Sequence, residues 1–246
     1  PVLQPHLLRR PPAQPDLLCL RFHQRAHSIL CAAPLQPPRL TVPLHLVRVA
    51  QVRHRDPVED LLEVEVPERA EYIRLIAVEL QRIASHLMWL GAYGPDIGNL
   101  SVLVWCLRER ELMMDLLQEL GGSRMHYNFP RVGGVKRDLP HGFAQRARAK
   151  VSLFLNRIQE YEALFDESTI FLIRTQGVGY SKAEDMVNHG VTGPNLRAGG
   201  VNYDVRTSHP YSVYSELDWE VPVERPSVKG ADCYDRYRIR VEEMRI

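Results

Sequence analysis

The fold of this chain is constrained most by residues 67–139, where apolar side chains recur with a helical period. In the first part of this stretch they stand three or four positions apart, at Ile73, Ile76, Leu80, Ile83, Leu87 and Leu90. That spacing places them on one face of a helix, which we expect to begin at Pro67. Gly91, Gly94 and Pro95 predict its end.

A second helix is predicted from Asn99 to the Gly121-Gly122 break. The two helices and the short GPDIG turn between them form an αα-hairpin, with Asp96 at its tip. An acid in a Gly/Pro-rich turn is often only turn chemistry or a helix cap, and spacing alone favours that interpretation.

The rest of the chain also contains signals of secondary structure. A helix is expected from His141 to Asp166, where large apolar residues repeat with heptad spacing. Further helical pieces are expected at 169–174, at 182–188 with Ser181 as N-cap, and from Asp232 to the end of the chain. Residues 217–223 alternate apolar and polar and predict a half-buried strand. The predicted fold class is mainly α, an antiparallel helical bundle with short extended segments.

The amino-acid composition excludes few classes of protein. With 45% hydrophobic and 25% charged residues and a net charge of +1, the 246-residue chain is ordinary for a globular protein. No apolar run reaches the ~18–20 residues of a membrane span. The four cysteines form no CxxC pair, so no zinc or iron–sulfur motif is indicated and no metal is assigned.

Residues 1–57 differ from the rest and are treated as a separate segment. They hold more than half of the chain's 18 prolines and half of its ten histidines, but only two acids, Asp16 and Asp56. Proline at this density breaks helices and central strands. The segment is either a disordered basic arm that touches nucleic acid or another acidic surface, or an out-of-frame or misassembled stretch that is not native; we prefer the second.

Residues 58–246 contain several blocks that resemble one family. The blocks are RAEYIR (69–74), SHLMWLGAYGPDIG (85–98), RERE (108–111), GGSRMHYNFPRVGGV (121–135), DLP (138–140), LRAGGVNYDVR (196–206), PYSVYSELDWEVPV (210–223) and GADCYDRYRIRVEEMR (230–245). In this order they resemble the D subunit of respiratory NADH:quinone oxidoreductase, complex I, a relative of the nickel–iron hydrogenase large subunit. Because that family continues beyond the last residue here, the resemblance implies a partial, hydrogenase large-subunit-like domain.

The resemblance gives four residues a role. It implies that Asp96 lies in the quinone pocket and that His86 and Asp96 serve proton coupling, since histidine titrates near neutral pH. It implies that His126 and Arg131 lie near the terminal iron–sulfur cluster of a neighbouring subunit. From the residues alone, His86 is a hydrogen-bonded, partly buried histidine and the 121–135 loop a solvated basic loop. The RERE run is a solvated, ion-paired or interface face with no catalytic role.

The resemblance also implies the partners. The quinone is the ligand, NAD binds elsewhere in the complex, and this chain supplies no cluster ligands. The expected partners are the cluster-bearing B subunit, the C subunit and the membrane-arm subunits, at the cytoplasmic face of the cell membrane, with no nucleic acid. Two alternatives stay open: an energy-converting hydrogenase large subunit, which needs paired cysteines for nickel and iron, and a non-catalytic interaction module or non-functional fragment.

Overall fold

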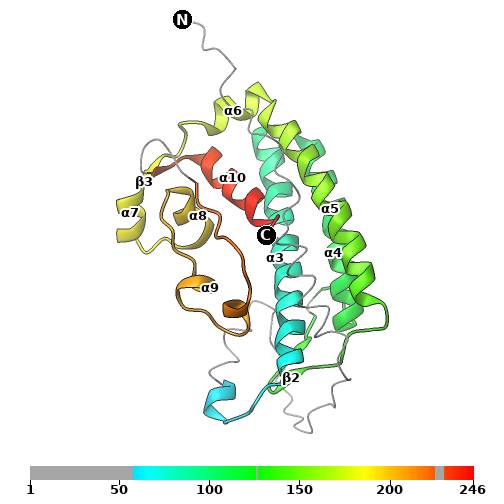
Figure 1. Cartoon of the computed structure of the whole chain (residues 1–246). Coiled ribbons are helices and arrows are strands. Elements are labelled where there is room, and N and C mark those ends of the chain that lie inside the picture. Colours follow the sequence, from blue (N-terminus) through cyan, green and yellow to red (C-terminus); the bar gives the residue numbers. More distant parts are fainter. Residues whose placement is uncertain (1–57, 126, 225–229) are drawn as a thin grey trace, which may run out of the picture.

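A single long helix, α3 (Glu68–Ile97), runs the length of the molecule in the computed structural model (Figure 1). The structure describes residues 58–125, 127–224 and 230–246, so the predictions for 1–57 lie outside the described residues. Helices α4 (Leu100–Gly121) and α5 (Phe143–Asp166) lie on one side of α3. Helix α10 (Cys233–Glu243) and the short elements before it lie on the other.

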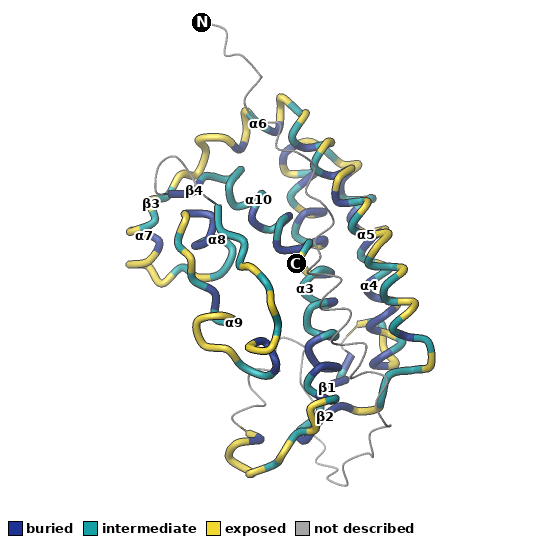
Figure 2. The backbone as a smooth tube through the Cα atoms, viewed as in Figure 1, coloured by how far each residue is buried: buried dark blue, intermediate teal, exposed yellow. Residues whose placement is uncertain are grey.

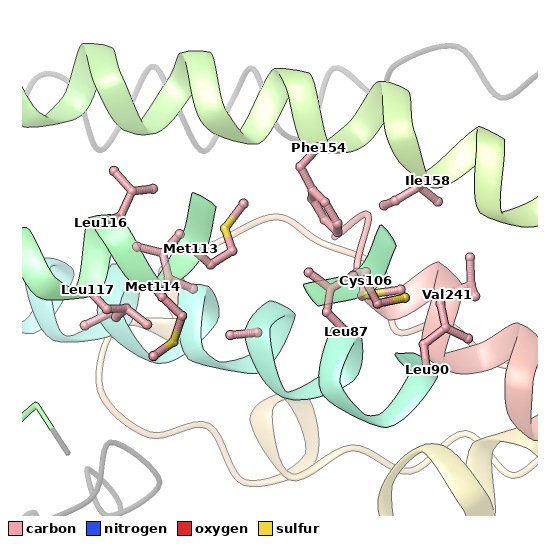
Figure 3. Close-up of a cluster of buried hydrophobic side chains, with 14 of the residues drawn as sticks. Leu87, Leu90, Cys106, Met113, Met114, Leu116, Leu117, Phe154, Ile158 and Val241 are labelled. Atoms are coloured by element: carbon pink, nitrogen blue, oxygen red, sulfur yellow. The ribbon is translucent and has the colours of Figure 1, made fainter. Parts of the chain in front are cut away.

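The main core fills the space between α3, α4, α5 and α10, and Figure 3 shows the side chains that meet there. They include Leu87 and Leu90 from α3, Cys106, Met113, Met114, Leu116 and Leu117 from α4, Phe154 and Ile158 from α5, and Val241 from α10. The apolar stripe predicted for the first helix and the heptad pattern predicted for 141–166 both point into this core. The mainly α prediction is confirmed.

The prediction that Gly91, Gly94 and Pro95 end the first helix is wrong, because α3 continues to Ile97 and closes at Gly98. A proline normally clashes with the Cβ of the residue before it, and Gly94 has no Cβ. The same glycine lets α4 approach closely, because a Cβ there would lie 2.7 Å from the Cβ of Val102. Packing against α4 therefore overrides the local helix-breaking signal.

The other side of α3 is built from short elements. They are α6 (Thr169–Thr175), β3 (Ser181–Lys182), α7 (Ala183–Asn188), α8 (Gly193–Ala198), α9 (Val205–Ser208), the 3₁₀-helix η2 (Tyr214–Glu216) and β4 (Gly230–Ala231). Strands β3 and β4 pair antiparallel. A two-stranded hairpin, β1 (Pro130–Arg131) with β2 (Gly134–Val135), lies beside the N-terminal half of α3 (Figures 1 and 2).

Three local predictions are corrected. Residues 217–223 have no regular secondary structure and alternate in burial at their start, but they pair with no strand among the described residues. Ser181 lies in β3, so it is not the cap of α7, whose N-cap Lys182 makes no side-chain capping bond. Helix α10 begins at a capping box on Asp232 and ends at Glu243, short of the last residue.

The RERE run is less solvated than its charges suggest. The Glu109 side chain is 3% exposed and pairs with Arg108 at 2.6 Å. The ion-paired interpretation therefore holds for this acid, and the solvated one does not. Within residues 58–125, 127–224 and 230–246, no helix combines the length and apolarity that crossing a membrane requires.

Candidate functional site

Asp96 lies in the last turn of α3 and its side chain is exposed. It does not cap α4, because the N-cap of that helix is Asn99. A carboxylate at the C-terminal end of a helix faces the negative end of the helix dipole, which disfavours it by about 0.3–1 kcal/mol. With the residues that the structure describes, Asp96 forms no hydrogen bond or ion pair. Neither capping nor helix stability explains this acid.

His86 lies further back along α3 and faces α10. Its Nε2 donates to Oε2 of Glu243 at 2.9 Å, and the two side chains are 13% and 1% exposed. A carboxylate can only accept, so this bond fixes Nε2 as the protonated nitrogen and leaves Nδ1 as the acceptor. The structure therefore confirms a hydrogen-bonded, partly buried histidine, and it leaves the coupling role a prediction.

Glu243 also accepts hydrogen bonds from two arginines in the short elements opposite α3. Arg197 Nη2 donates to Oε1 of Glu243 at 2.8 Å, and Arg206 Nη2 donates to the same oxygen at 2.9 Å. Arg206 also donates to both oxygens of Asp204, at 3.0 and 2.7 Å. These groups tie the start of α9 and the end of α8 to the end of α10.

The cluster continues to α3 through a second acid. Arg82 donates to Glu79 at 2.9 Å, and its Nη1 lies 3.8 Å from Glu243. Glu79 in turn accepts a hydrogen bond from the hydroxyl of Tyr214. We call the whole set the Glu243 network: Glu79, Arg82, His86, Arg197, Asp204, Arg206, Tyr214 and Glu243. Its three carboxylates balance its three guanidiniums, so a second proton on His86 would leave it with one net positive charge.

Two acids of the network, Glu243 and Asp204, are held ionised. Burial alone would raise the pKa of the Glu243 carboxyl, but the hydrogen bond from His86 and the charges of Arg197 and Arg206 outweigh it and hold that pKa well below its ordinary value. The same opposition lowers the pKa of Asp204, where the bonds from Arg206 exceed the cost of burial. The network is therefore an ionic structure at neutral pH.

Arg131 lies in the β1–β2 hairpin, at the opposite end of α3 from Asp96. Its backbone pairs with Gly134, and the guanidinium of Arg74 donates to its carbonyl oxygen at 2.6 Å. His126 lies outside the described residues, so its prediction has no structural counterpart here. The hairpin is thus fixed to α3 through backbone atoms.

The described site residues do not meet in one cleft: His86 and Asp96 lie on α3, and Arg131 lies in the hairpin near the other end of that helix. His86 and Asp96 are ten residues apart on the same helix, which is about 15 Å along its axis. Arg74, which holds the hairpin, lies about 18 Å from His86 in the other direction. Sequence patterns gave Glu243 and Arg74 no functional role; their only signal was a charged residue inside a quoted block.

The described residues supply no metal centre. Among them no group of three or more His, Cys, Asp or Glu side chains could hold a metal ion. Of the two described cysteines, Cys106 is buried in the core, where burial raises the pKa of its thiol to about 12. Cys233 begins α10.

Comparison with known proteins gives a consistent family. Residues 96–246 match the family described as "Respiratory-chain NADH dehydrogenase, 49 Kd subunit". The D 2 subunit of NADH-quinone oxidoreductase from Rhizobium etli is 48% identical over 188 residues, 76% of this chain and 46% of that protein. The D subunit from Desulforamulus reducens is 48% identical over 187 residues, covering 76% of this chain and 50% of that protein.

A chloroplast protein is also similar to this chain. The H subunit of the chloroplastic NAD(P)H-quinone oxidoreductase of Zygnema circumcarinatum is 44% identical over 187 residues, 76% of this chain and 47% of that protein. The chain spans about half the length of the curated relatives it matches. The chain belongs to the 49 kDa subunit family of respiratory-chain NADH dehydrogenase.

Proposed function

We propose that this chain forms part of the quinone-reducing site of a proton-translocating NADH:quinone oxidoreductase. In this role it lies at the cytoplasmic face of the membrane between the B subunit, which carries the terminal iron–sulfur cluster, and the membrane-arm subunits, with the C subunit alongside. NAD binds elsewhere in the complex. The cluster supplies the electrons, and this chain supplies residues that hold the quinone and move protons.

The observation that carries the proposal is the arrangement along α3. Asp96 is an exposed carboxylate without a partner among the described residues, at a helix end that disfavours it. Such an acid is suited to contact a ligand or a neighbouring subunit. Quinone reduction consumes two protons along with two electrons, so an acid at the quinone must be resupplied from a second group. The names of the relatives, all quinone oxidoreductase subunits, support this substrate.

His86 is the second group. Its Nε2 proton is held by Glu243, so a further proton enters at Nδ1 and gives the balanced Glu243 network a net positive charge. The distance of about 15 Å between His86 and Asp96 exceeds one proton transfer, so the path between them includes water or residues of other subunits.

The test places residues 58–246 in the matching segment of the Rhizobium etli D 2 subunit and measures the assembled complex. Asp96→Asn keeps the shape of the side chain and removes its proton chemistry. Because a positioned proton donor contributes about 10²–10⁴-fold, we expect quinone reduction by NADH to fall about a hundredfold. NADH oxidation with an artificial acceptor, which bypasses the quinone site, should stay at the unsubstituted level.

Asp185→Asn is the matched control, because Asp185 is an exposed acid on α7, away from α3. It should leave both reactions unchanged. Quinone reduction that survives Asp96→Asn at the full rate would refute the role given to Asp96.

A further inference from the structure

The guanidinium of Arg74 uses all five of its N–H donors inside the protein. Its Nε donates to the carbonyl of Gly134 at 2.9 Å. Nη1 donates to Glu59 at 3.0 Å and to Glu71 at 2.6 Å, and Nη2 donates to Glu59 and to the carbonyl of Arg131, both at 2.6 Å. The side chain is 0% exposed. A guanidinium has five donors in a rigid fork, so this one is saturated and cannot shift without breaking several bonds.

Glu59 contacts both Arg74 and the hairpin. Its carboxylate is paired with Arg74 through both oxygens, and Oε1 also accepts from the backbone amide of Gly133 at 2.7 Å. The Glu59 side chain is 6% exposed. Arg74 therefore binds the carbonyl groups of both strands, while Glu59 binds the amide at the turn between them.

The hairpin is short and is held by its contacts with the rest of the protein: Phe129 and Val135 pack into the main core, and the bonds of Arg74 and Glu59 hold its backbone. Strands β1 and β2 contain two residues each, and two-stranded hairpins alone are marginally stable in water. Gly133 and Gly134 have φ values of 82° and 146°, a region that residues with a side chain rarely adopt. A short hairpin with such a backbone depends on contacts outside itself for its position.

We propose that Arg74 and Glu59 are positioning residues that lock the β1–β2 hairpin onto α3 and thereby fix the place of Arg131. The lock is made through backbone atoms, so it sets where the Arg131 backbone stands and leaves its side chain available to a partner. This proposal rests on the proposed function: by fixing the Arg131 backbone, the lock limits how far the positive charge of Arg131 lies from the terminal cluster of the B subunit.

The first test uses the full chain and measures amide hydrogen exchange residue by residue. Arg74→Lys keeps the charge but has three donors in place of a five-donor fork, and Glu59→Gln puts an amide against the guanidinium. Each variant should speed exchange at Gly133 and its neighbours in the hairpin about tenfold or more, while α5 and α10 exchange as before. Where Arg74→Lys fails to fold, Glu59→Gln decides the result.

Arg146→Lys is the control for the Arg74 variant, since Arg146 is an exposed arginine of α5 that pairs with Glu119. It should leave hairpin exchange unchanged. Wild-type exchange at Gly133 in Glu59→Gln and in a folded Arg74→Lys would overturn the proposal.

The second test separates this proposal from the proposed function. In the assembled chimaeric complex, Arg74→Lys should shift the midpoint potential of the terminal cluster, and Arg146→Lys should not. If the unsubstituted chimaera does not reduce quinone, the proposed function fails while the exchange result still stands. If the chimaera reduces quinone but Arg74→Lys leaves the potential at its original value, the link from the lock to Arg131 is refuted.

Discussion

Glu243 is the central acid of the Glu243 network. His86, Arg197 and Arg206 all donate to its carboxylate, and that side chain is 1% exposed. A buried charge is tolerated where partners compensate it fully, and removing one member leaves the others unpaired. Trp219 adds to the enclosure, because the guanidinium of Arg206 lies 4.4 Å from its ring centroid. Loss of the central acid, Glu243, should therefore leave the other charges of the network without compensation.

Glu243→Gln should lower the free energy of unfolding at pH 7 by about 3–5 kcal/mol, the usual cost of breaking a buried ion pair from one side. Chemical denaturation measures it, with Glu220→Gln, at an exposed position, as a control that should change little. An unfolding free energy equal to that of the unsubstituted chain would show that the network does not stabilise the fold.

The depressed pKa of Glu243 also predicts a response to acid. The ordinary value for this carboxyl is 4.5 and the folded value is lower, so its contribution is fully present above that pH. The contribution should decline as the pH falls below 4.5 toward the folded-state pKa, because the unfolded chain then binds the proton more readily. The free energy of unfolding, measured from about pH 6 to about pH 3, should depend less steeply on pH in Glu243→Gln. Equal slopes for the two proteins would contradict the assignment.

At the scale of elements, the contact of α3 with α4 depends on glycine. At Gly94 a Cβ would lie 2.7 Å from Val102 Cβ and 2.9 Å from the Asn99 carbonyl oxygen. Gly94→Ala should therefore lower the free energy of unfolding by about 1–3 kcal/mol through overpacking, although alanine favours a helix by about 1 kcal/mol. Ser85→Ala, at an exposed position of α3, should leave stability equal or slightly higher. A Gly94→Ala protein as stable as the original would show that the helices can separate at no cost.

The same element shows what sequence patterns could and could not predict. Periodicity was enough to place α3 and α5, because their apolar faces are set by spacing. It failed at Gly94-Pro95, where a contact with α4 decides the helix end, and at 217–223, where alternation holds but no partner strand is present among the described residues. Local signals carry no information about such long-range contacts.

The block RAEYIR connects blocks that are far apart in the sequence. Its Arg69 pairs with Asp138 of the DLP block at 3.0 Å, and its Tyr72 donates to Glu216 of the PYSVYSELDWEVPV block at 2.7 Å. Arg74 holds the hairpin of the GGSRMHYNFPRVGGV block. These partners could not be predicted from spacing, because each contact joins residues more than about fifty positions apart, and helical periodicity reports only neighbours three or four positions away.

At the scale of the whole molecule, α3 sets the spacing between the proposed proton groups and the hairpin that carries Arg131. Asp96 and Arg131 were found through the family resemblance, and the structure places them toward opposite ends of one helix. Glu59 and Glu243 became visible only with the fold, because burial and pairing identify them. The structure adds Glu59, which helps to hold the hairpin of Arg131, and Glu243, which holds His86.

The central claim is tested most directly by asking whether residues 58–246 work inside a quinone-reducing complex. The chimaeric protein, expressed in Rhizobium etli lacking its own D 2 subunit, should restore quinone reduction by NADH together with proton translocation. Restoration that requires both the Glu243 network and Asp96 is the predicted result. A chimaera that assembles, oxidises NADH with an artificial acceptor and still reduces no quinone would contradict the central claim.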